Sequence, residues 1–252
     1  MIKWLLAVAM SLAWITTAEA KGITAKSWAV ADANGRILAG QDLDTPRPIA
    51  SISKLLTVMI VMDAGQSLSD FLYLSDRARN PLPSDEPYTR RSLIALAMIR
   101  SDNRAAYTLC EQYPGGYDAC ITAMNAKARE LGMTKTSLRD PTGLDDDNVS
   151  TARDLVKLTV AARRYDIINW AARNPTVEVL TLRGQYTFRN TDPLVGQRDD
   201  IVVSKTGYIS ASGGCIVIGT KSRNIVLLAS KSVRTRIPEA KQLIAKPFSR
   251  ES

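Results

Sequence analysis

The sequence of 252 residues contains no histidine. This absence excludes every mechanism that depends on imidazole, including Ser-His-Asp triads, Cys-His pairs and His-ligated zinc. Aromatic residues make up only 6% of the chain, and its net charge of +8 is spread without a long basic run. We therefore predict no nucleic-acid partner, no metal and no other cofactor. If the protein is an enzyme, a side chain other than histidine must move its protons.

Long apolar runs are also lacking, apart from a short one near the N-terminus. Lys3 precedes a mainly apolar stretch over residues 4–15, and the small-x-small triplet Ala18-Glu19-Ala20 follows it. This order is typical of a cleaved secretory signal, whereas a membrane span needs about 20 apolar residues. We predict a signal peptide over residues 1–20 and a secreted mature chain over residues 21–252 without a stable membrane anchor.

Cysteine is scarce, with three in the chain. Cys110 and Cys120 flank the turn-forming sequence Pro114-Gly115-Gly116, so an oxidising compartment would close them into a small disulfide loop. Two reduced thiols are the alternative. Cys215 lies in an apolar, strand-like run and is predicted to be a buried, inert thiol.

Turn signals and apolar patterns indicate strands at both ends of the chain. Residues 25–33 and 36–39 flank Asn34-Gly35, a pair that favours a tight hairpin. Five short β-prone runs in the last third predict an antiparallel meander, and residues 236–245 predict a terminal helix. The five runs cover residues 176–182, 185–188, 201–204, 215–219 and 225–229.

The middle of the chain is predicted to be helical. Residues 51–64 form an apolar run that stops before Gly65, and residues 91–113 have helical composition on both sides of a polar triplet. Thr151 and Asp154 resemble a capping box at the start of another helix. Without a linker or a repeat, the expected fold class is α+β. We predict one domain, in which a helical lobe is inserted into a lobe whose sheet combines N- and C-terminal strands.

Residues 140–148 form a turn-rich loop with four aspartates. A calcium-binding loop requires a glutamate at its twelfth position, but Thr151 stands there when counting begins at Asp140. We therefore predict a solvated turn.

Ser51 and Lys54 lie three residues apart at the start of the first predicted helix. Side chains with this spacing share a helix face, so the Lys54 amine can reach the Ser51 hydroxyl. The helix N-terminus disfavours protonation of a nearby lysine, and an uncharged amine can act as the base that histidine cannot supply. Alone, an S-x-x-K pattern is expected by chance about once in a chain of this length.

Two rarer motifs accompany this pattern, namely Ser101-Asp102-Asn103 and Lys205-Thr206-Gly207. The three together resemble the active-site motifs of penicillin-binding proteins and serine β-lactamases. Sequences over residues 48–55, 140–144, 149–155 and 204–208 are similar to those of low-molecular-mass D-alanyl-D-alanine peptidases. The resemblance covers nearly all of the mature chain. It implies a serine β-lactamase/D,D-peptidase-like fold, with an antiparallel sheet flanked by helices.

The resemblance also implies a role for each residue of the first two motifs. Ser51 would attack the substrate carbonyl and form an acyl-enzyme, while Lys54 accepts its proton. Ser101 would relay that proton to the leaving amine, and Asn103 would lie between Lys54 and the substrate backbone. We expect Asp102 to have a structural role, because a carboxylate directed into the site would stabilise the lysine cation.

The third motif would bind substrate. Lys205 and Thr206 would bind a carboxylate beside the scissile amide, and Gly207 would allow the substrate to approach the strand closely. The backbone N–H groups of Ser51 and Tyr208 would form the oxyanion hole. The sequence differs from those of related endopeptidases at two places where a change could alter substrate fit. These are Asn190-Thr191-Asp192 and Gly213-Gly214.

The predicted function is that of a periplasmic serine D,D-endopeptidase that cleaves D-alanyl-meso-diaminopimelyl cross-links in peptidoglycan. The absence of a further C-terminal β domain and of an amphipathic tail favours an endopeptidase. D-alanyl-D-alanine carboxypeptidase activity on peptidoglycan stem peptides is the alternative. β-Lactam antibiotics would be covalent inhibitors. A non-catalytic peptidoglycan-binding module is less favoured because all three motifs are complete, and a β-lactamase because no Glu-x-x-Leu-Asn loop is present.

Overall fold

The computed structural model describes residues 22–79 and 81–248. The predicted signal peptide lies outside these residues. Within them, a five-stranded antiparallel sheet has the strand order β2-β1-β11-β10-β9, so strands from both ends of the chain share one sheet as predicted. These strands are β1 (Ser27–Asp32), β2 (Ile37–Gln41), β9 (Ile201–Ile209), β10 (Gly213–Thr220) and β11 (Arg223–Ser230).

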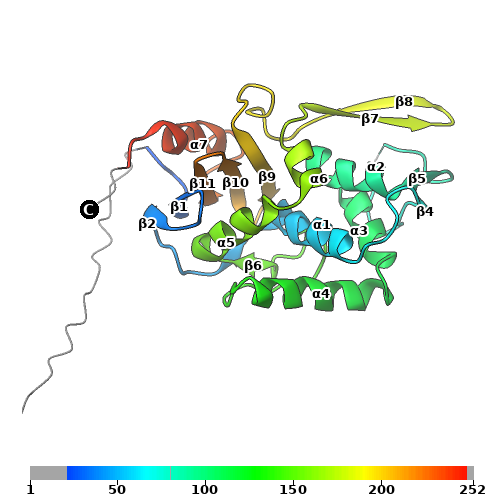
Figure 1. Ribbon diagram of the computed structural model, residues 1–252, viewed down its shortest axis with the longest axis horizontal. Helices are drawn as coiled ribbons and strands as arrows, with labels where there is room; N and C mark the ends of the chain where they lie inside the picture. The colour runs from blue at the N-terminus through cyan, green and yellow to red at the C-terminus, as the bar shows by residue number, and fades with distance from the viewer. Residues whose placement is uncertain (1–21, 80, 249–252) are drawn as a thin grey trace, which may run out of the picture.

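The sheet is buried on both faces, because its strands send alternate apolar side chains into two cores. Trp28 belongs to the core beneath α7 (Arg236–Ala245), and Ala29 belongs to the core shared with α5 (Ala152–Ala162). Figure 1 shows α7 and α5 on opposite sides of the sheet. The edge strand β9 contacts η1 (Ala50–Ile52), which brings the third motif to the first.

A helical lobe completes the molecule (Figure 1). Its central helix, α1 (Ser53–Asp63), is buried along nearly its whole length, as its apolar composition predicts. Gly65 follows the end of this helix and has a φ of +64°. The lobe comprises α1 (Ser53–Asp63), α2 (Arg90–Ala95), the π-helical η2 (Leu96–Arg100), α3 (Asn103–Glu111), α4 (Gly116–Glu130) and α6 (Asp166–Ala171). Its short strand pairs are β3 (Arg47–Pro48) with β6 (Val149–Ser150), and β4 (Phe71–Tyr73) with β5 (Pro87–Thr89).

The predicted meander is correct for β9, β10 and β11 but wrong for the two runs before them. β7 (Thr176–Thr181) and β8 (Gly184–Arg189) form a separate two-stranded sheet (Figure 1). Only alternate residues of β7, Val177 and Val179, are buried. This hairpin therefore has one apolar face, and that face packs against η2 instead of extending the large sheet.

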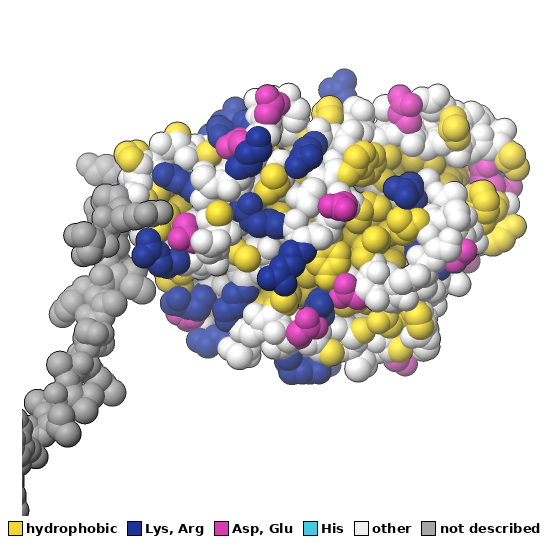
Figure 2. All heavy atoms as spheres, viewed as in Figure 1, with side chains coloured by type: hydrophobic (Ala, Val, Ile, Leu, Met, Phe, Trp, Pro, Cys, Tyr) yellow, Lys and Arg dark blue, Asp and Glu magenta, His cyan; other side chains and the backbone are white. Residues whose placement is uncertain are grey.

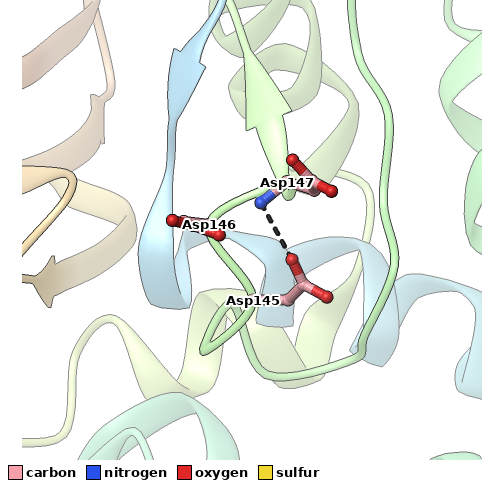
Figure 3. Close-up of side chains that lie close together, drawn as sticks. All are labelled: Asp145, Asp146 and Asp147. Carbon is pink, nitrogen blue, oxygen red and sulfur yellow. Dashed lines mark hydrogen bonds between the residues drawn. The ribbon is translucent and has the colours of Figure 1, made fainter.

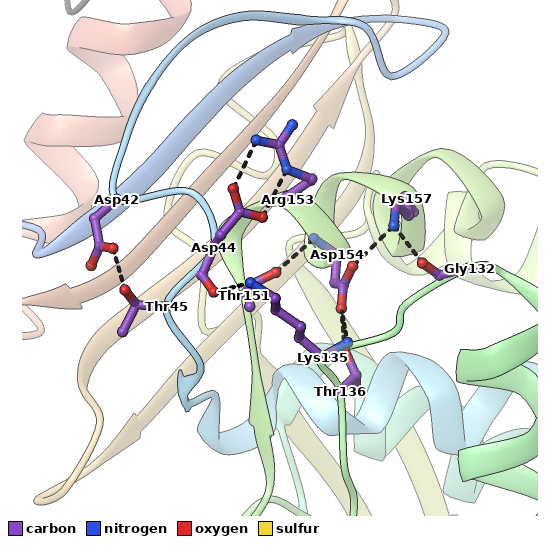
Figure 4. A network of polar contacts seen from close by, with 10 residues as sticks. All are labelled: Asp42, Asp44, Thr45, Gly132, Lys135, Thr136, Thr151, Arg153, Asp154 and Lys157. Carbon is purple, nitrogen blue, oxygen red and sulfur yellow. Dashed lines mark hydrogen bonds and ion pairs between the residues drawn. The ribbon is translucent and has the colours of Figure 1, made fainter.

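The predicted capping box at α5 is only half present. Thr151 Oγ1 accepts a hydrogen bond from the Asp154 nitrogen at 3.1 Å, so Thr151 caps the helix. The buried Asp154 carboxylate does not complete the box. It accepts hydrogen bonds from the Lys135 nitrogen at 2.9 Å and from Lys157 Nζ at 3.0 Å (Figure 4). Asp154 therefore connects α5 to the loop that follows α4.

The predicted disulfide between Cys110 and Cys120 is confirmed, with the two Cα atoms 5.4 Å apart. It joins the end of α3 to α4. Cys215 is fully buried on β10, and burial raises the pKa of its thiol, as expected for an inert cysteine.

One face of the molecule differs between the part that carries the five-stranded sheet and the helical lobe. Figure 2 shows Lys and Arg side chains concentrated over the part that carries the five-stranded sheet, and hydrophobic side chains more frequent over the helical lobe. A hollow of about 320 Å³ in the helical lobe is lined by Met62, Leu68, Arg91, Asp166, Ile167 and Trp170. None of the helices in the described residues has the length and apolar character needed to cross a membrane.

Candidate active site

Ser51 lies in η1, immediately before α1. The preceding residue, Ala50, has a φ of +48°, a left-handed conformation that L-residues other than glycine rarely adopt. Such a conformation costs on the order of 1–3 kcal/mol and persists only where the surrounding structure enforces it. Tertiary packing therefore determines the shape of the turn that carries Ser51.

Lys54 is fully buried, and its Nζ atom contacts three oxygen atoms. Ser51 Oγ is 2.8 Å away, whereas Asn103 Oδ1 and the Thr142 carbonyl oxygen are each 2.7 Å away. The amide and carbonyl oxygens can only accept hydrogen bonds. An uncharged amine has two hydrogens and one lone pair, so both hydrogens point to these two acceptors. The lone pair then faces Ser51 Oγ.

Burial lowers the pKa of Lys54 to about 7, because the ammonium ion loses its solvation. The negative charges of Asp140 and Asp102 oppose this change. At neutral pH much of the Lys54 population is therefore the uncharged amine, which is the form that can accept a proton from Ser51.

The second motif lies where η2 ends and α3 begins. Ser101 has a φ of +62°, and its Oγ accepts a hydrogen bond from Lys205 Nζ at 2.8 Å. Asn103 is the first residue of α3 and contacts Lys54. Asp102 has the expected structural role, because its Oδ1 caps α3 by accepting from the Ala105 nitrogen at 2.9 Å. Its charge nevertheless raises the pKa of Lys54.

Lys205 is buried on β9. Its Nζ donates to Ser101 Oγ and, at 3.0 Å, to the Thr206 carbonyl oxygen. Burial and the positive charges of Lys54 and Arg236 hold the pKa of Lys205 well below its usual value. The two buried amines therefore contact two residues of the same motif. Lys54 of α1 contacts Asn103, and Lys205 of β9 contacts Ser101.

Gly207 is needed because β9 passes close to the turn that carries Ser51. A β-carbon on Gly207 would lie 2.9 Å from the Ile49 carbonyl oxygen and 3.1 Å from the Ser51 nitrogen. Packing against the backbone of residues 49–51 therefore requires a glycine here, and the close approach of substrate to Gly207 stays a prediction. Tyr208, the next residue, has 53% of its surface exposed.

Three residues that the sequence analysis did not assign to the site contact the third motif or its strand. The buried Arg236 of α7 donates a hydrogen bond to the Gly207 carbonyl oxygen at 2.7 Å. Thr191 Oγ1 accepts from the Thr206 hydroxyl at 2.6 Å, and Asp192 Oδ2 accepts from the neighbouring serine of β9 at 2.6 Å. The Asn190-Thr191-Asp192 sequence was a signal for the last two. No local pattern indicated that the terminal helix reaches β9.

The prediction of a solvated turn over residues 140–148 is wrong for part of the loop. Asp140 and Asn148 are buried, and the Thr142 carbonyl oxygen accepts a hydrogen bond from Lys54. The physical reason is that buried backbone groups need partners, and the buried carboxylate and amide supply them inside the loop. The signal that could have revealed this was the Asp140–Leu144 sequence, which the family resemblance had already singled out.

The other three aspartates of this loop, residues 145–147, are exposed as a solvated turn predicts. Figure 3 shows them close together along the loop, where the Asp147 nitrogen donates to Asp145 Oδ1 at 2.9 Å. These carboxylates are separate from the contacts of Lys54.

The geometry supports nucleophilic catalysis without histidine. A hydroxyl lies 2.8 Å from an amine whose pKa is about 7, and the remaining hydrogens of that amine are oriented by two acceptors. A buried arginine provides positive charge on the side of β9, next to the second buried lysine, Lys205. This arrangement suits an acyl transfer from a substrate that carries a carboxylate near the bond to be cleaved.

Comparison with known proteins identifies the family. A family model described as D-alanyl-D-alanine carboxypeptidase, peptidase family S11, matches residues 15–230. The chain is 40% identical to the D-alanyl-D-alanine endopeptidase of Escherichia coli K12 over 222 residues, which cover 83% of this chain and 71% of that protein. It is 37% identical to the Pseudomonas aeruginosa D-alanyl-D-alanine endopeptidase over 229 residues, which cover 85% and 74%.

The solved structures agree with this result. Penicillin-binding protein D2 of Listeria monocytogenes, in its ampicillin-bound form, has a TM-score of 0.80 and 27% identity. The alignment covers 88% of this chain and 96% of that one. The chain therefore belongs to the D-alanyl-D-alanine carboxypeptidase family of peptidases, and the protein is a serine-type D-Ala-D-Ala peptidase with a penicillin-binding protein fold.

Proposed function

We propose that the protein is a D,D-endopeptidase that cleaves D-alanyl-meso-diaminopimelyl cross-links in peptidoglycan through an acyl-enzyme on Ser51. The observation that carries this proposal is the contact of 2.8 Å between Lys54 Nζ and Ser51 Oγ. The two hydrogens of the uncharged Lys54 amine are bonded to Asn103 Oδ1 and to the Thr142 carbonyl oxygen. The preference for cross-links is supported by relatives at 37–40% identity that are named endopeptidases.

In the acylation step, Ser51 Oγ attacks the carbonyl carbon of the D-alanine residue while its proton passes to Lys54 Nζ. The carbonyl oxygen becomes an oxyanion, which the backbone N–H groups of Ser51 and Tyr208 stabilise. The C–N bond then breaks, and the leaving amine takes up the proton. Water attacks the ester in the second step, which releases the D-alanine carboxylate and regenerates the Ser51 hydroxyl.

Ser101 is the proposed relay of the proton to the leaving amine. Ser101 Oγ is 2.8 Å from Lys205 Nζ, so its hydroxyl hydrogen is free to point away from that donor and toward the leaving group. Lys205 and Thr206 would bind the carboxylate beside the scissile amide. The buried positive charge of Arg236 behind them favours an anionic substrate group at this position.

The second candidate function is carboxypeptidase activity on the terminal D-Ala-D-Ala bond of uncross-linked stem peptides. The description of the matching family model favours it. Both reactions use the same nucleophile and base, and they differ only in the amine that leaves. The product of the reaction therefore distinguishes them.

The proposal extends to the cellular location and to inhibitors. Residues 1–20 would be a signal peptide that directs a single domain over residues 21–252 to the periplasm. β-Lactams would acylate Ser51, because a β-lactam presents a reactive amide carbonyl to the same nucleophile. The ampicillin-bound form of the Listeria relative supports this expectation.

The test is digestion of purified cross-linked peptidoglycan with the mature protein, followed by liquid chromatography with mass detection. Conversion of dimeric muropeptides to monomers by the wild type, and not by Ser51→Ala, is the expected result. Loss of terminal D-alanine alone would establish the carboxypeptidase instead. If neither product forms, both candidate functions fail.

A further inference from the structure

Asp140 is a buried carboxylate that the proposed chemistry does not use. It has 5% of its surface exposed, although it lies in a loop. Its Oδ1 accepts hydrogen bonds from the Thr142 nitrogen, the Thr142 hydroxyl and the Gly143 nitrogen at 2.5, 2.8 and 2.7 Å, and its Oδ2 accepts from the Asp145 nitrogen at 2.6 Å. One side chain therefore determines the backbone conformation of residues 140–145.

The part of the loop that Asp140 organises is also attached to α1. The Asn148 amide nitrogen donates to Ser53 Oγ at 3.0 Å and to the Asp140 carbonyl oxygen at 2.9 Å. Thr57 Oγ1 donates to the Pro141 carbonyl oxygen at 2.7 Å. These contacts fix the loop along the same helix that carries Lys54. Thr142 lies between Pro141 and Asn148 in the chain, and its carbonyl oxygen accepts a hydrogen bond from Lys54 Nζ at 2.7 Å.

We propose that Asp140 is a positioning residue for Lys54, which acts through the Thr142 carbonyl oxygen and through its own negative charge. The inference rests on the proposed function, in which Lys54 is the base. Asp140 accepts hydrogen bonds from the Thr142 nitrogen, the Thr142 hydroxyl and the Gly143 nitrogen. It thereby directs the Thr142 carbonyl oxygen to one of the two hydrogens of the Lys54 amine. The lone pair is thereby left for Ser51.

The charge of Asp140 acts in addition to this geometry. The groups that face Lys54 are Ser51 from η1, Asn103 and Asp102 from α3, and Thr142 with Asp140 from the loop. Lys205 of β9 is a further titratable group nearby, and the positive charge of Lys54 helps to lower its pKa. Burial lowers the proton affinity of Lys54, and the two aspartates partly restore it. Asp140 thus keeps the amine basic enough to deprotonate a hydroxyl.

The two effects of Asp140 can be separated because they predict pH shifts of opposite sign. Removal of the charge alone lowers the pKa of Lys54, so the rising limb of the pH-rate profile moves to lower pH. Loosening of the loop alone admits water to Lys54, which raises its pKa and moves the limb to higher pH. Entry of water into a loosened loop therefore cannot produce the downward shift.

The experiment measures the second-order rate constant of acylation by a fluorescent penicillin between pH 5 and 9 for wild type and Asp140→Asn. We expect the rising limb to move down by about one pH unit and the rate at the plateau to fall about tenfold or more. An unshifted or upward-shifted limb in a folded variant would overturn the proposal. Asp147→Asn is the matched control, because it removes an exposed aspartate from the same loop and should leave the profile unchanged.

Asp140→Glu tests the positioning effect separately and provides a second variant if Asp140→Asn does not fold. It keeps the charge but displaces the carboxylate by one methylene. We expect a reduced plateau rate without the downward shift of the limb, and a wild-type plateau rate would overturn the positioning role. Failure of the proposed function looks different, because Lys54→Met would then be acylated at the wild-type rate.

Discussion

Gly143 lies directly against Ala50, the residue before the nucleophile. A β-carbon on Gly143 would overlap the Ala50 carbonyl group and would reach within 2.8 Å of the Ser51 nitrogen. Both residues have left-handed backbones, with φ values of +81° and +48°. The loop that contacts Lys54 and the turn that carries Ser51 are therefore packed backbone to backbone. This contact leaves no room for any side chain at position 143.

The first prediction concerns this contact. Gly143→Ala should reduce the free energy of unfolding by about 3 kcal/mol or more and strongly reduce penicillin acylation, because the backbone near Ser51 must move. Gly116→Ala is the matched control. Gly116 has a φ of +80°, but a β-carbon there would meet no neighbouring atom within 4 Å. We therefore expect Gly116→Ala to reduce the free energy of unfolding by only about 1 kcal/mol and to leave acylation normal. Thermal unfolding and fluorescent penicillin labelling give both results, and equal effects of the two substitutions would contradict this prediction.

A second prediction follows from the pKa of Lys54, which burial lowers to about 7. Only the uncharged amine can accept the Ser51 proton, so the acylation rate should rise with pH. The uncharged fraction, and with it the rate, should increase about tenfold between pH 6 and pH 8. Stopped-flow acylation by a penicillin across this range is the measurement. A rate that stays constant or falls with pH would refute the role of Lys54 as base.

The third prediction is the effect of the same group on stability. The pKa of Lys54 in the folded protein lies below its usual value of 10.5, so the unfolded chain binds more protons between these two values. The destabilising effect is fully present below about pH 7 and disappears as the pH rises to 10.5. Relative to Lys54→Met, the wild type should therefore gain stability from pH 7 to pH 10. Urea unfolding at several pH values tests this, and a constant difference would disprove it.

The fourth prediction compares two aspartates of one polar network (Figure 4). Asp154 is buried and accepts from the Lys135 nitrogen and from Lys157, whereas the exposed Asp44 pairs with Arg153 at 2.9 Å. Asp154→Ala should reduce the free energy of unfolding by about 2 kcal/mol, because the hydrogen bonds that the buried carboxylate accepts are lost. Asp44→Ala should change it by less than about 1 kcal/mol, because solvent screens the pair. Denaturant unfolding of both variants is the test, and the reverse order would contradict the structure.

The fifth prediction concerns the disulfide. Cys110 and Cys120 are ten residues apart and close a small loop, so replacing both by alanine should reduce the free energy of unfolding by about 3 kcal/mol. The bond lies at the far end of α3 from Asn103, so penicillin acylation of the folded variant should remain normal. Unfolding with and without a reducing agent provides the comparison. A variant that is folded but not acylated would show that the disulfide also shapes the site.

Local sequence was sufficient for the features that depend on residues close together in the chain. Ser51 and Lys54 are three residues apart where η1 leads into α1, and this spacing allows the contact of 2.8 Å between their side chains. The Asn34-Gly35 hairpin, the limits of α1 and the terminal helix are local in the same sense. The two rarer motifs added the remaining predicted site residues through a family resemblance, not through any physical pattern.

Only the tertiary structure decided which distant groups meet. The Thr142 carbonyl oxygen contacts Lys54 across 88 residues of sequence, and Ser101 contacts Lys205 across 104. The lowered pKa of Lys54 also depends on the fold, because desolvation exists only when other elements exclude water. The β7–β8 hairpin illustrates the same limit. Alternating residues determine that a strand has one apolar face, but the partner that covers this face is determined by the packing of the whole chain.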